Sequence, residues 1–352
     1  MEFHSLISGE RRGFDAALLR SMLSAVEVPY SLAVGWRNRC FDTGRFRAQP
    51  VNVPVASVGN LTLGGTGKTP MVAWLARWLN DRGARVAIVS RGYGGVRGRL
   101  NDEALELPQR LPDVPHILNR DRVAGARQAI VEHRAEVLVL DDAFQHRWIA
   151  RDLDIVLIDA LAPFGYDRVF PRGMLREPPR GLSRAQVVAL SRADAVDAAT
   201  RDEIRRRVRA IVPHVIWLET THAPLHWRSA QGETVAVPQL AGASVAAFSG
   251  IGNPKGFRHT LDMAGVHVAD ERVFPDHHHF TDQDMHALDG WVCGLGPVDA
   301  VVCTQKDLVK LNTSHIADRP LYALTIGLNI SHGREAFEQE LRERLTGVFD
   351  LM

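Results

Sequence analysis

The sequence predicts an α/β protein in which a mostly parallel sheet is covered by helices on both faces. Segments of five to eight apolar residues, which indicate buried strands, alternate with helical segments along most of the chain. A glycine-rich turn joins the first of these strands to the first of these helices. The length of 352 residues allows two domains of this kind.

The larger domain is expected at residues 49–221. Its predicted strands lie at residues 51–58, 85–90, 136–140, 153–159, 185–190 and 214–219. Its predicted helices lie at residues 70–82, 122–133 and 198–211. Strands that are apolar throughout favour a parallel sheet, because both of their faces must be buried.

The pattern changes near residue 222. Residues 225–228 and 234–237 flank Gln231-Gly232, which predicts a β-hairpin, and we expect residues 222–241 to link two domains. In residues 242–352 the alternation resumes, which predicts a second, smaller α/β/α domain. Its strands are expected at 245–249, 266–274, 300–303 and 321–326, and its helices at 254–264, 282–295 and 334–345.

Residues 1–48 form a separate amphipathic segment. Apolar side chains recur at helical spacing until Pro29, which we expect to break the helix. Basic residues follow it. The apolar residues are Phe14, Leu18, Leu19, Met22, Leu23 and Val26, and the basic ones are Arg37, Arg39, Arg45 and Arg47. This pattern suits a helix in a membrane interface, and it is equally typical of an amphipathic helix packed on its own domain.

Composition excludes several classes of protein. The formal net charge is +1, so no global field attracts nucleic acid, and we expect no nucleic-acid partner. Cys40, Cys293 and Cys303 form no CxxC pair, which favours a reducing compartment over a disulfide framework. Residues 1–13 are polar and charged, so no signal peptide is expected.

The glycine-rich turn predicts a phosphate-binding loop. Its candidate nucleotide-binding residues are Thr62, Leu63, Gly64, Gly65, Thr66, Gly67, Lys68 and Thr69. Backbone N–H groups of such a turn and the following helix N-terminus point at phosphate oxygens. Lys68 would reach the β- and γ-phosphates, and the Thr69 hydroxyl would bind Mg²⁺. Thr62 stands where the strict P-loop pattern has its first glycine.

An acidic pair completes this motif. Asp141 and Asp142 follow the apolar strand 136–140, at the end where ligands bind in open α/β sheets, and are the candidate metal ligands. A turn stabilised by aspartate would show the same residues. With the loop upstream, the pair predicts a P-loop NTPase-type sheet that binds ATP and Mg²⁺.

The chain resembles the tetraacyldisaccharide 4′-kinase family over nearly its whole length. The resemblance rests on eight short motifs in a fixed order. They are 58–62 with Lys68-Thr69-Pro70, Ser90-Arg91-Gly92-Tyr93-Gly94-Gly95, Asn101-Asp102-Glu103-Ala104, Asp141-Asp142-Ala143-Phe144-Gln145-His146, Leu175-Arg176-Glu177-Pro178, Gly250-Ile251-Gly252-Asn253-Pro254, Phe274-Pro275-Asp276-His277-His278 and Thr304-Gln305-Lys306-Asp307. Asn101, Ala104, Ala143 and Gln305 depart from the usual family pattern.

The resemblance implies a reaction, a substrate and a location. ATP would phosphorylate the 4′-hydroxyl of a tetraacyldisaccharide 1-phosphate, an acylated lipid, and give lipid IVA. Mg²⁺ would be the cofactor of this transfer. The enzyme would be a peripheral protein at the cytoplasmic face of the bacterial inner membrane. We expect a monomer.

The resemblance also implies a general base. Asp102 would deprotonate the sugar hydroxyl, and His277 would orient it. From the residues alone, Asp102 is equally a helix start, and Asp276-His277-His278 is either a solvated loop or a zinc site.

Further residues are weaker candidates for contacts with substrate or transition state. They are Arg91, Glu103, Arg122, Gln145, His146, Arg176 and Glu177. Cations there would stabilise charge on the transferred phosphoryl group, although Arg176 and Glu177 would also suit a structural ion pair. Two other functions stay open at this point: a P-loop regulatory or metal-delivery NTPase without a lipid acceptor, and a kinase for a soluble metabolite.

Overall fold

The computed structural model describes residues 2–92, 107–108, 110–276, 278–311 and 313–345. The chain forms two compact units. Unit 1 comprises residues 1–92, 112–221 and 330–352, and unit 2 comprises residues 93–111 and 222–329.

Unit 1 is built on a parallel sheet. Its strand order is β3-β2-β4-β1-β5-β6-β7, and every neighbouring pair is parallel. The strands are β1 (Val55–Asn60), β2 (Val86–Ser90), β3 (His116–Leu118), β4 (Val137–Asp141), β5 (Leu153–Asp159), β6 (Val187–Ser191) and the first part of β7 (Ile216–Ser229). All residues of β1, β2, β4, β5 and β6 are buried, which confirms the α/β class.

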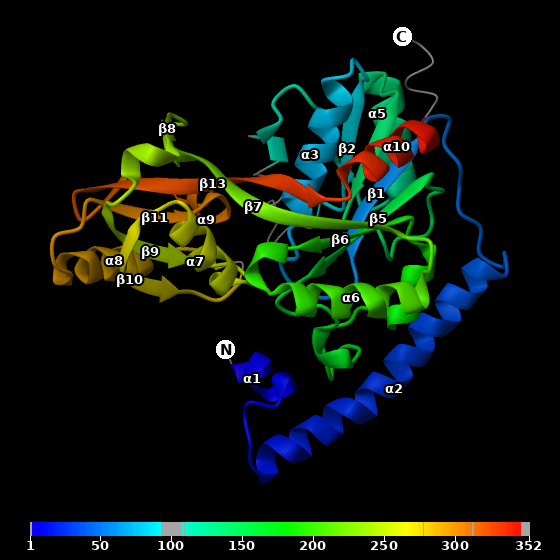
Figure 1. The fold of residues 1–352 in the computed structure, drawn as a ribbon, viewed down its shortest axis with the longest axis horizontal. Coiled ribbons are helices and arrows are strands. Elements are labelled where there is room, and N and C mark those ends of the chain that lie inside the picture. Colours follow the sequence, from blue (N-terminus) through cyan, green and yellow to red (C-terminus); the bar gives the residue numbers. More distant parts are fainter. Residues whose placement is uncertain (1, 93–106, 109, 277, 312, 346–352) are drawn as a thin grey trace. The chain divides into compact units, whose positions relative to one another are not determined.

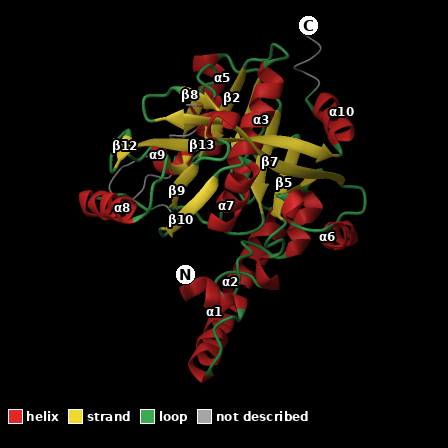
Figure 2. Ribbon diagram, turned by 60° about the vertical axis from the view of Figure 1, so that its left-hand side comes forward, coloured by secondary structure: helices red, strands yellow, loops and turns green. Residues whose placement is uncertain are grey.

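Helices cover both faces of this sheet (Figures 1 and 2). On one face α5 (Arg122–His133) packs on β2 and β4, and α6 (Ala198–Ile211) packs on β5 and β6. α3 (Lys68–Asn80) leads from β1 in the opposite direction across the sheet, so its right-handed crossover lies on the other face. There the Trp74 ring stacks on Phe337 of α10 (Arg334–Arg344) at 5.5 Å.

The polar ends of the parallel strands meet at one edge of the unit 1 sheet. β1, β2, β4, β5 and β6 end at Asn60, Ser90, Asp141, Asp159 and Ser191. These strands are mostly apolar up to this point, with Ser57 and Asp154 as buried polar exceptions, and the side chains at the carboxyl ends are buried but polar. This edge carries the candidate site.

Unit 2 contributes a second group of parallel strands. β9 (Ser244–Ser249), β10 (His267–Val273), β11 (Ala300–Thr304) and β13 (Arg319–His332) pair in the order β10-β9-β11-β13. Two apolar clusters lie on the two faces of this group. The helices of unit 2 are α7 (Pro254–Met263), α8 (Asp282–Gly294) and α9 (Gln305–Leu308), and β12 (His315–Ile316) pairs with β13.

The hairpin is present, but its first strand is longer than predicted. β7 runs unbroken through residue 222, where we expected a break, and its end pairs antiparallel with β8 (Thr234–Ala236). The alternating burial of β7 explains the error, because a strand with one face partly exposed lacks a continuous apolar signal.

The predicted domain boundaries differ from the compact units in two places. Residues 330–352, which we placed in the second domain, group with unit 1, and residues 93–111 group with unit 2. The Trp74–Phe337 stack gives α10 its place in unit 1. Local sequence patterns cannot predict that a segment distant in the sequence packs on the other unit.

The amino-terminal segment contains two helices. α1 (Glu2–Ser8) precedes α2 (Phe14–Asp42), the long helix at the lower right of Figure 1. The prediction that Pro29 breaks this helix was wrong, since Pro29 lies inside it. Proline removes one helical hydrogen bond, and contacts of Glu27 with the Val169 amide and of Tyr30 with Arg176 O on either side of Pro29 offset that loss. Short 3₁₀ helices complete the chain: η1 (Gly165–Asp167), η2 (Pro179–Arg184), η3 (Ala193–Ala195) and η4 (Val237–Leu240).

Candidate active site

The phosphate loop leaves β1 and enters α3 at Lys68. A Cβ on Gly59 would come within 2.6 Å of the Phe144 Cβ, so only glycine permits this close approach. Gly67 precedes the helix in the left-handed region, at φ 84°. Lys68 and Thr69 open the helix and are 6% and 5% exposed, and Thr66 is equally buried. The strand, loop and helix therefore have the order that the motif requires.

Hydrogen bonds from a second loop support the first half of the phosphate loop. The Leu63 amide donates to Met174 O at 2.7 Å, and the Arg176 amide donates to Leu61 O at 2.7 Å. Thr62 forms a β-bridge with Leu175. Thr62, which departs from the strict P-loop pattern, thus belongs to a short two-stranded connection.

Asp142 lies between two cations. Lys68 Nζ is 3.5 Å from Asp142 Oδ1, and Arg176 Nη1 donates to both carboxylate oxygens at 2.9 and 3.0 Å. Burial acts to raise the pKa of Asp142, but Lys68 and Arg176 outweigh it and lower that pKa to about 2. The left-handed backbone at this turn falls on Asp142, at φ 48°, and not on Ala143. Alanine at position 143 therefore adds no backbone strain to this turn.

Asp141 is oriented from β2 and β3. Ser90 Oγ donates to Asp141 Oδ2 at 3.3 Å, and His116 Nε2 lies 2.7 Å from Ser90 Oγ. The serine proton is used on the carboxylate, so the imidazole must donate from Nε2. Burial lowers the pKa of His116 to about 4, which keeps it neutral. Arg122 is 2% exposed and donates to Asp141 O at 3.2 Å.

These residues suit Mg²⁺. Thr69 and the acidic pair offer hydroxyl and carboxylate oxygens, and the Asp142 side chain is 32% exposed and so accessible. Among the described residues no group of three or more His, Cys, Asp or Glu could hold a metal. Mg²⁺ sites at nucleotides need only one or two carboxylates, because phosphates and water complete the shell. Among the described residues of the segment Asp276-His277-His278 there is therefore no zinc site.

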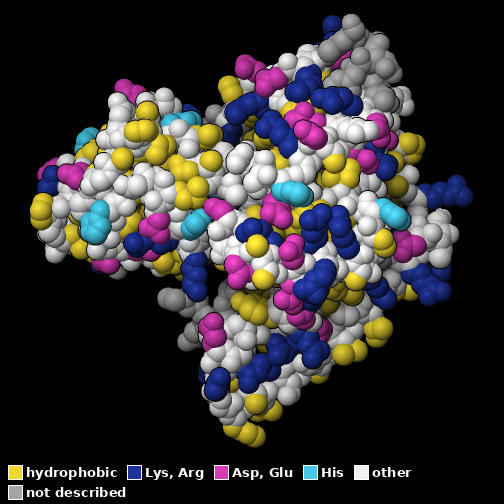
Figure 3. Space-filling view, in the orientation of Figure 1, with side chains coloured by type: hydrophobic (Ala, Val, Ile, Leu, Met, Phe, Trp, Pro, Cys, Tyr) yellow, Lys and Arg dark blue, Asp and Glu magenta, His cyan; other side chains and the backbone are white. Residues whose placement is uncertain are grey.

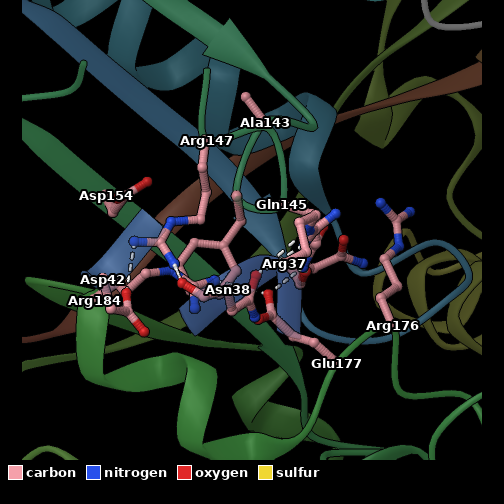
Figure 4. A network of polar contacts seen from close by, with 12 residues as sticks. Arg37, Asn38, Asp42, Ala143, Gln145, Arg147, Asp154, Arg176, Glu177 and Arg184 are labelled. Atoms are coloured by element: carbon pink, nitrogen blue, oxygen red, sulfur yellow. Dashed lines mark hydrogen bonds and ion pairs between the residues drawn. The ribbon is translucent and has the colours of Figure 1, made fainter. Parts of the chain in front are cut away.

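Glu177 is the centre of a buried network (Figure 4). Its side chain is fully buried and accepts from Asn38 Nδ2 at 2.7 Å, Arg184 Nη2 at 2.8 Å and Gln145 Nε2 at 3.1 Å. Gln145 also donates to Asn60 O at 2.9 Å. The network joins α2 to the end of β1, so Glu177 and Gln145 are placed to support the site.

Of the remaining predicted site residues, the structure describes His146 and Arg91 and does not describe the other three. His146 is partly buried, and burial followed by the charge of Arg122 lowers its pKa to about 4. Arg91 is exposed directly after β2. Asp102, Glu103 and His277 lie outside the described residues, so their roles stay predictions.

Sequence reasoning missed four residues at this site. Ser90 and His116 hold Asp141, and Asp159 and Arg192 lie beside the phosphate loop. Ser90 and Asp159 each end an apolar strand at the same edge as Asp141. The rule that identified Asp141 would have found these two, whereas His116 and Arg192 give no local signal.

The fold and this site define a P-loop phosphotransferase: a glycine-rich loop, a lysine at its helix start and an acidic pair on a neighbouring strand. A family model, tetraacyldisaccharide-1-P 4′-kinase, matches residues 19–346. The chain belongs to this family of enzymes.

Individual relatives agree. A tetraacyldisaccharide 4′-kinase of Anaeromyxobacter sp. (strain K) is 38% identical, covering 94% of this chain and 92% of the relative. One from Desulfatibacillum aliphaticivorans is 36% identical, covering 96% and 94%. The crystal structure of LpxK from Aquifex aeolicus in complex with ATP superposes with a TM-score of 0.70 at 29% identity, covering 93% of this chain and 99% of that one.

Proposed function

We propose that this kinase transfers the γ-phosphate of ATP to the 4′-hydroxyl of tetraacyldisaccharide 1-phosphate, which forms lipid IVA in lipid A biosynthesis. The observation that carries this proposal is the Lys68–Asp142–Arg176 arrangement at the phosphate loop of a chain in this family. A kinase for a soluble metabolite, and an NTPase without an acceptor, would not account for the family match.

The residues of unit 1 have separate tasks in this reaction. Lys68 and the N–H groups that open α3 would bind the β- and γ-phosphates, and Arg176 lies close enough to share the charge that develops on the transferred group. Thr69, Asp141 and Asp142 would hold Mg²⁺, which when bound neutralises phosphate charge. Ser90 and His116 keep Asp141 in place.

The sugar hydroxyl must lose its proton as the phosphoryl group arrives. We assign this step to Asp102, with His277 as its partner, on the family resemblance of the two motifs. Replacement of Asp102 by alanine should lower kcat about a thousandfold at unchanged ATP binding. Turnover near the wild-type rate would overturn the assignment.

We also propose that α2 lies in the cytoplasmic surface of the inner membrane, with the protein monomeric and peripheral. Its first two thirds expose large apolar side chains, among them Phe14 at 85%, Met22 at 60% and Leu32 at 69%. Figure 3 shows hydrophobic side chains along this segment with basic ones beside them. Within the described residues, α2 is also the single helix long and apolar enough to cross a membrane.

The substrate gives a physical reason for this placement. Lifting a lipid from the bilayer costs about 0.8 kcal/mol per exposed CH₂, so the enzyme must approach the surface. The carboxyl end of α2 is fixed to unit 1 through Asn38, and through Asp42, which accepts from Arg147 Nη2 at 2.7 Å. Nearer its middle, Glu27 accepts from the Val169 amide at 2.8 Å and Tyr30 Oη donates to Arg176 O at 3.3 Å, so the part of α2 available to lipid is its exposed apolar side chains.

Two measurements test the proposal. Transfer of labelled γ-phosphate to purified disaccharide 1-phosphate lipid should occur with the wild type and fail with Lys68→Ala. Co-sedimentation with phospholipid vesicles should be lost when Met22 and Leu32 are both changed to glutamate. Formation of labelled product by a wild type that does not bind vesicles would support the kinase activity and overturn the proposed membrane position of α2.

A further inference from the structure

The phosphate loop has few side chains that could hold its shape. A Cβ on Gly65 would meet no heavy atom within 4 Å, and Gly64 has a φ of 102°. A Cβ on Gly64 would meet the flexible Met174 side chain at 3.5 Å, so little packing surrounds these two glycines and hydrogen bonds help to hold their backbone.

One of these hydrogen bonds comes from a side chain outside the loop. Arg192 Nη2 donates to Gly65 O at 2.9 Å. The Thr66 amide donates to Gly64 O at 3.1 Å. Because a peptide unit is planar, the unit between Gly65 and Thr66 is held at both its oxygen and its nitrogen.

Arg192 is itself held by a carboxylate. Its Nε donates to Asp159 Oδ1 at 2.9 Å, and its Nη2 donates to Asp159 Oδ2. The two residues are 5% and 7% exposed. A guanidinium with two parallel bonds to one carboxylate has a fixed plane, so its remaining contact has a fixed direction.

The strand register places this pair beside the loop. Asp159 ends β5 opposite Ser191, the last residue of β6, and Arg192 follows directly. Arg192 has left-handed backbone angles, φ 54° and ψ 39°. Residues other than glycine adopt this conformation only at a cost in free energy. An outlier of this kind beside a binding loop is a reason to look for a function.

We propose that Arg192, oriented by Asp159, is a positioning residue for ATP: it holds Gly65 and Thr66 in the conformation that receives the phosphates. The proposal rests on the kinase function above and adds to it a residue pair outside the phosphate-loop motif. Arg192 acts through the loop backbone and does not take part in phosphoryl transfer.

The test compares ATP affinity with folding. Arg192→Gln should raise both the KM and the Kd for ATP about tenfold, the effect of losing one charge-assisted hydrogen bond, with KM for the lipid unchanged. Arg192→Lys should have KM and Kd values for ATP between those of the wild type and Arg192→Gln, because a lysine ammonium cannot bind the carboxylate and the carbonyl together. Hydrogen exchange at Leu63–Thr66 without nucleotide should become faster in both variants.

A double variant separates positioning from structure. Arg192→Gln leaves the Asp159 charge buried and lowers Tm, and Arg192→Gln with Asp159→Asn removes that charge. The double variant should recover part of the Tm and keep the raised KM for ATP. A folded double variant that binds ATP as the wild type does would overturn the proposal.

Arg201 provides a matched control. It forms an ion pair with Glu219 at 3.2 Å and donates to Ala193 O at 3.1 Å and Val196 O at 2.7 Å, and these three partners lie outside the phosphate loop. Arg201→Gln should lower Tm and leave the KM for ATP unchanged. An equal rise in KM for this control would show general destabilisation and overturn the proposal. A wild type that does not bind ATP would instead overturn the kinase function.

Discussion

Lys68–Asp142 in unit 1 and Lys310–Asp307 in unit 2 are ion pairs of nearly equal length, 3.5 and 3.4 Å. Each lies just past the carboxyl end of a parallel strand, β4 in one unit and β11 in the other. We call them the phosphate-loop pair and the unit 2 pair. Their surroundings differ in ways that give one a role in binding and the other a role in folding.

The difference lies in what else reaches the carboxylate. Asp307 is fully buried and accepts from the Gly250 amide at 3.0 Å and the Thr304 hydroxyl at 2.6 Å. These bonds fasten the loop after β9 to the end of β11. Asp142 is 32% exposed, and its side chain faces the cations Lys68 and Arg176.

The pKa values follow these surroundings. Burial raises the pKa of Asp307 above its usual range, whereas the two cations at Asp142 outweigh burial and lower its pKa. The cations beside Asp142 can also bind a phosphate, and the exposed carboxylate itself can accept a metal ion. Asp307 is enclosed by its donors and can do neither, so composition alone does not identify a catalytic pair.

The largest expected effect concerns the two lysines. Lys68→Met should lower kcat about a thousandfold, because one preorganised cation at a transferring phosphoryl group has that effect. Lys310→Met should leave kcat, measured on folded protein, within about twofold of the wild type, since the carboxylate that Lys310 faces is fully buried and bonds to the loop after β9. Phosphate transfer to the lipid acceptor measures both.

This comparison has a clear failing outcome. A loss of kcat for Lys310→Met as large as for Lys68→Met, at full folding by circular dichroism, would mean that the unit 2 pair also serves the reaction.

The sequence predicted Lys68 as a phosphate-binding residue and Asp142 as a metal ligand, but not the contact between them. Lys68 and Asp142 were found because loop, helix start and strand end are local patterns. Asp307 also lies in a family motif, and its burial depends on Gly250, which is distant in the sequence. Burial of a charged group is a tertiary property.

The fold was predicted on the same terms. The strand at Leu153–Asp159 and the helices Arg122–His133 and Ala198–Ile211 have the predicted bounds, because each has strong periodicity and clear ends. The continuation of α2 through Pro29 and the return of α10 to unit 1 were missed. Both depend on what the helix packs against.

The second prediction concerns stability. Asp307→Asn should lower the free energy of unfolding by about 3 kcal/mol, because it removes the buried negative charge that faces the Lys310 ammonium. Asp142→Asn should lower it by about 1 kcal/mol or less, since that carboxylate is partly exposed. Urea unfolding at pH 7 measures both, and equal losses would contradict the assigned roles.

The smallest effect is a pH dependence of opposite sign at the two carboxylates. Asp142 has a pKa of about 2 in the folded protein against 3.8 as its ordinary value, so the unfolded chain takes up the proton first as pH falls. Its stabilisation is complete above about pH 4 and is lost towards pH 2, an effect of about 1 kcal/mol after solvent screening.

Asp307 has a raised pKa, so the folded protein takes up its proton first, and acid relieves the buried charge. Asp142→Asn should therefore flatten the fall of unfolding free energy between pH 4 and 2 relative to wild type, and Asp307→Asn should steepen the fall that begins above pH 4. Parallel acid profiles for the two variants would show that the two pairs do not differ in charge environment.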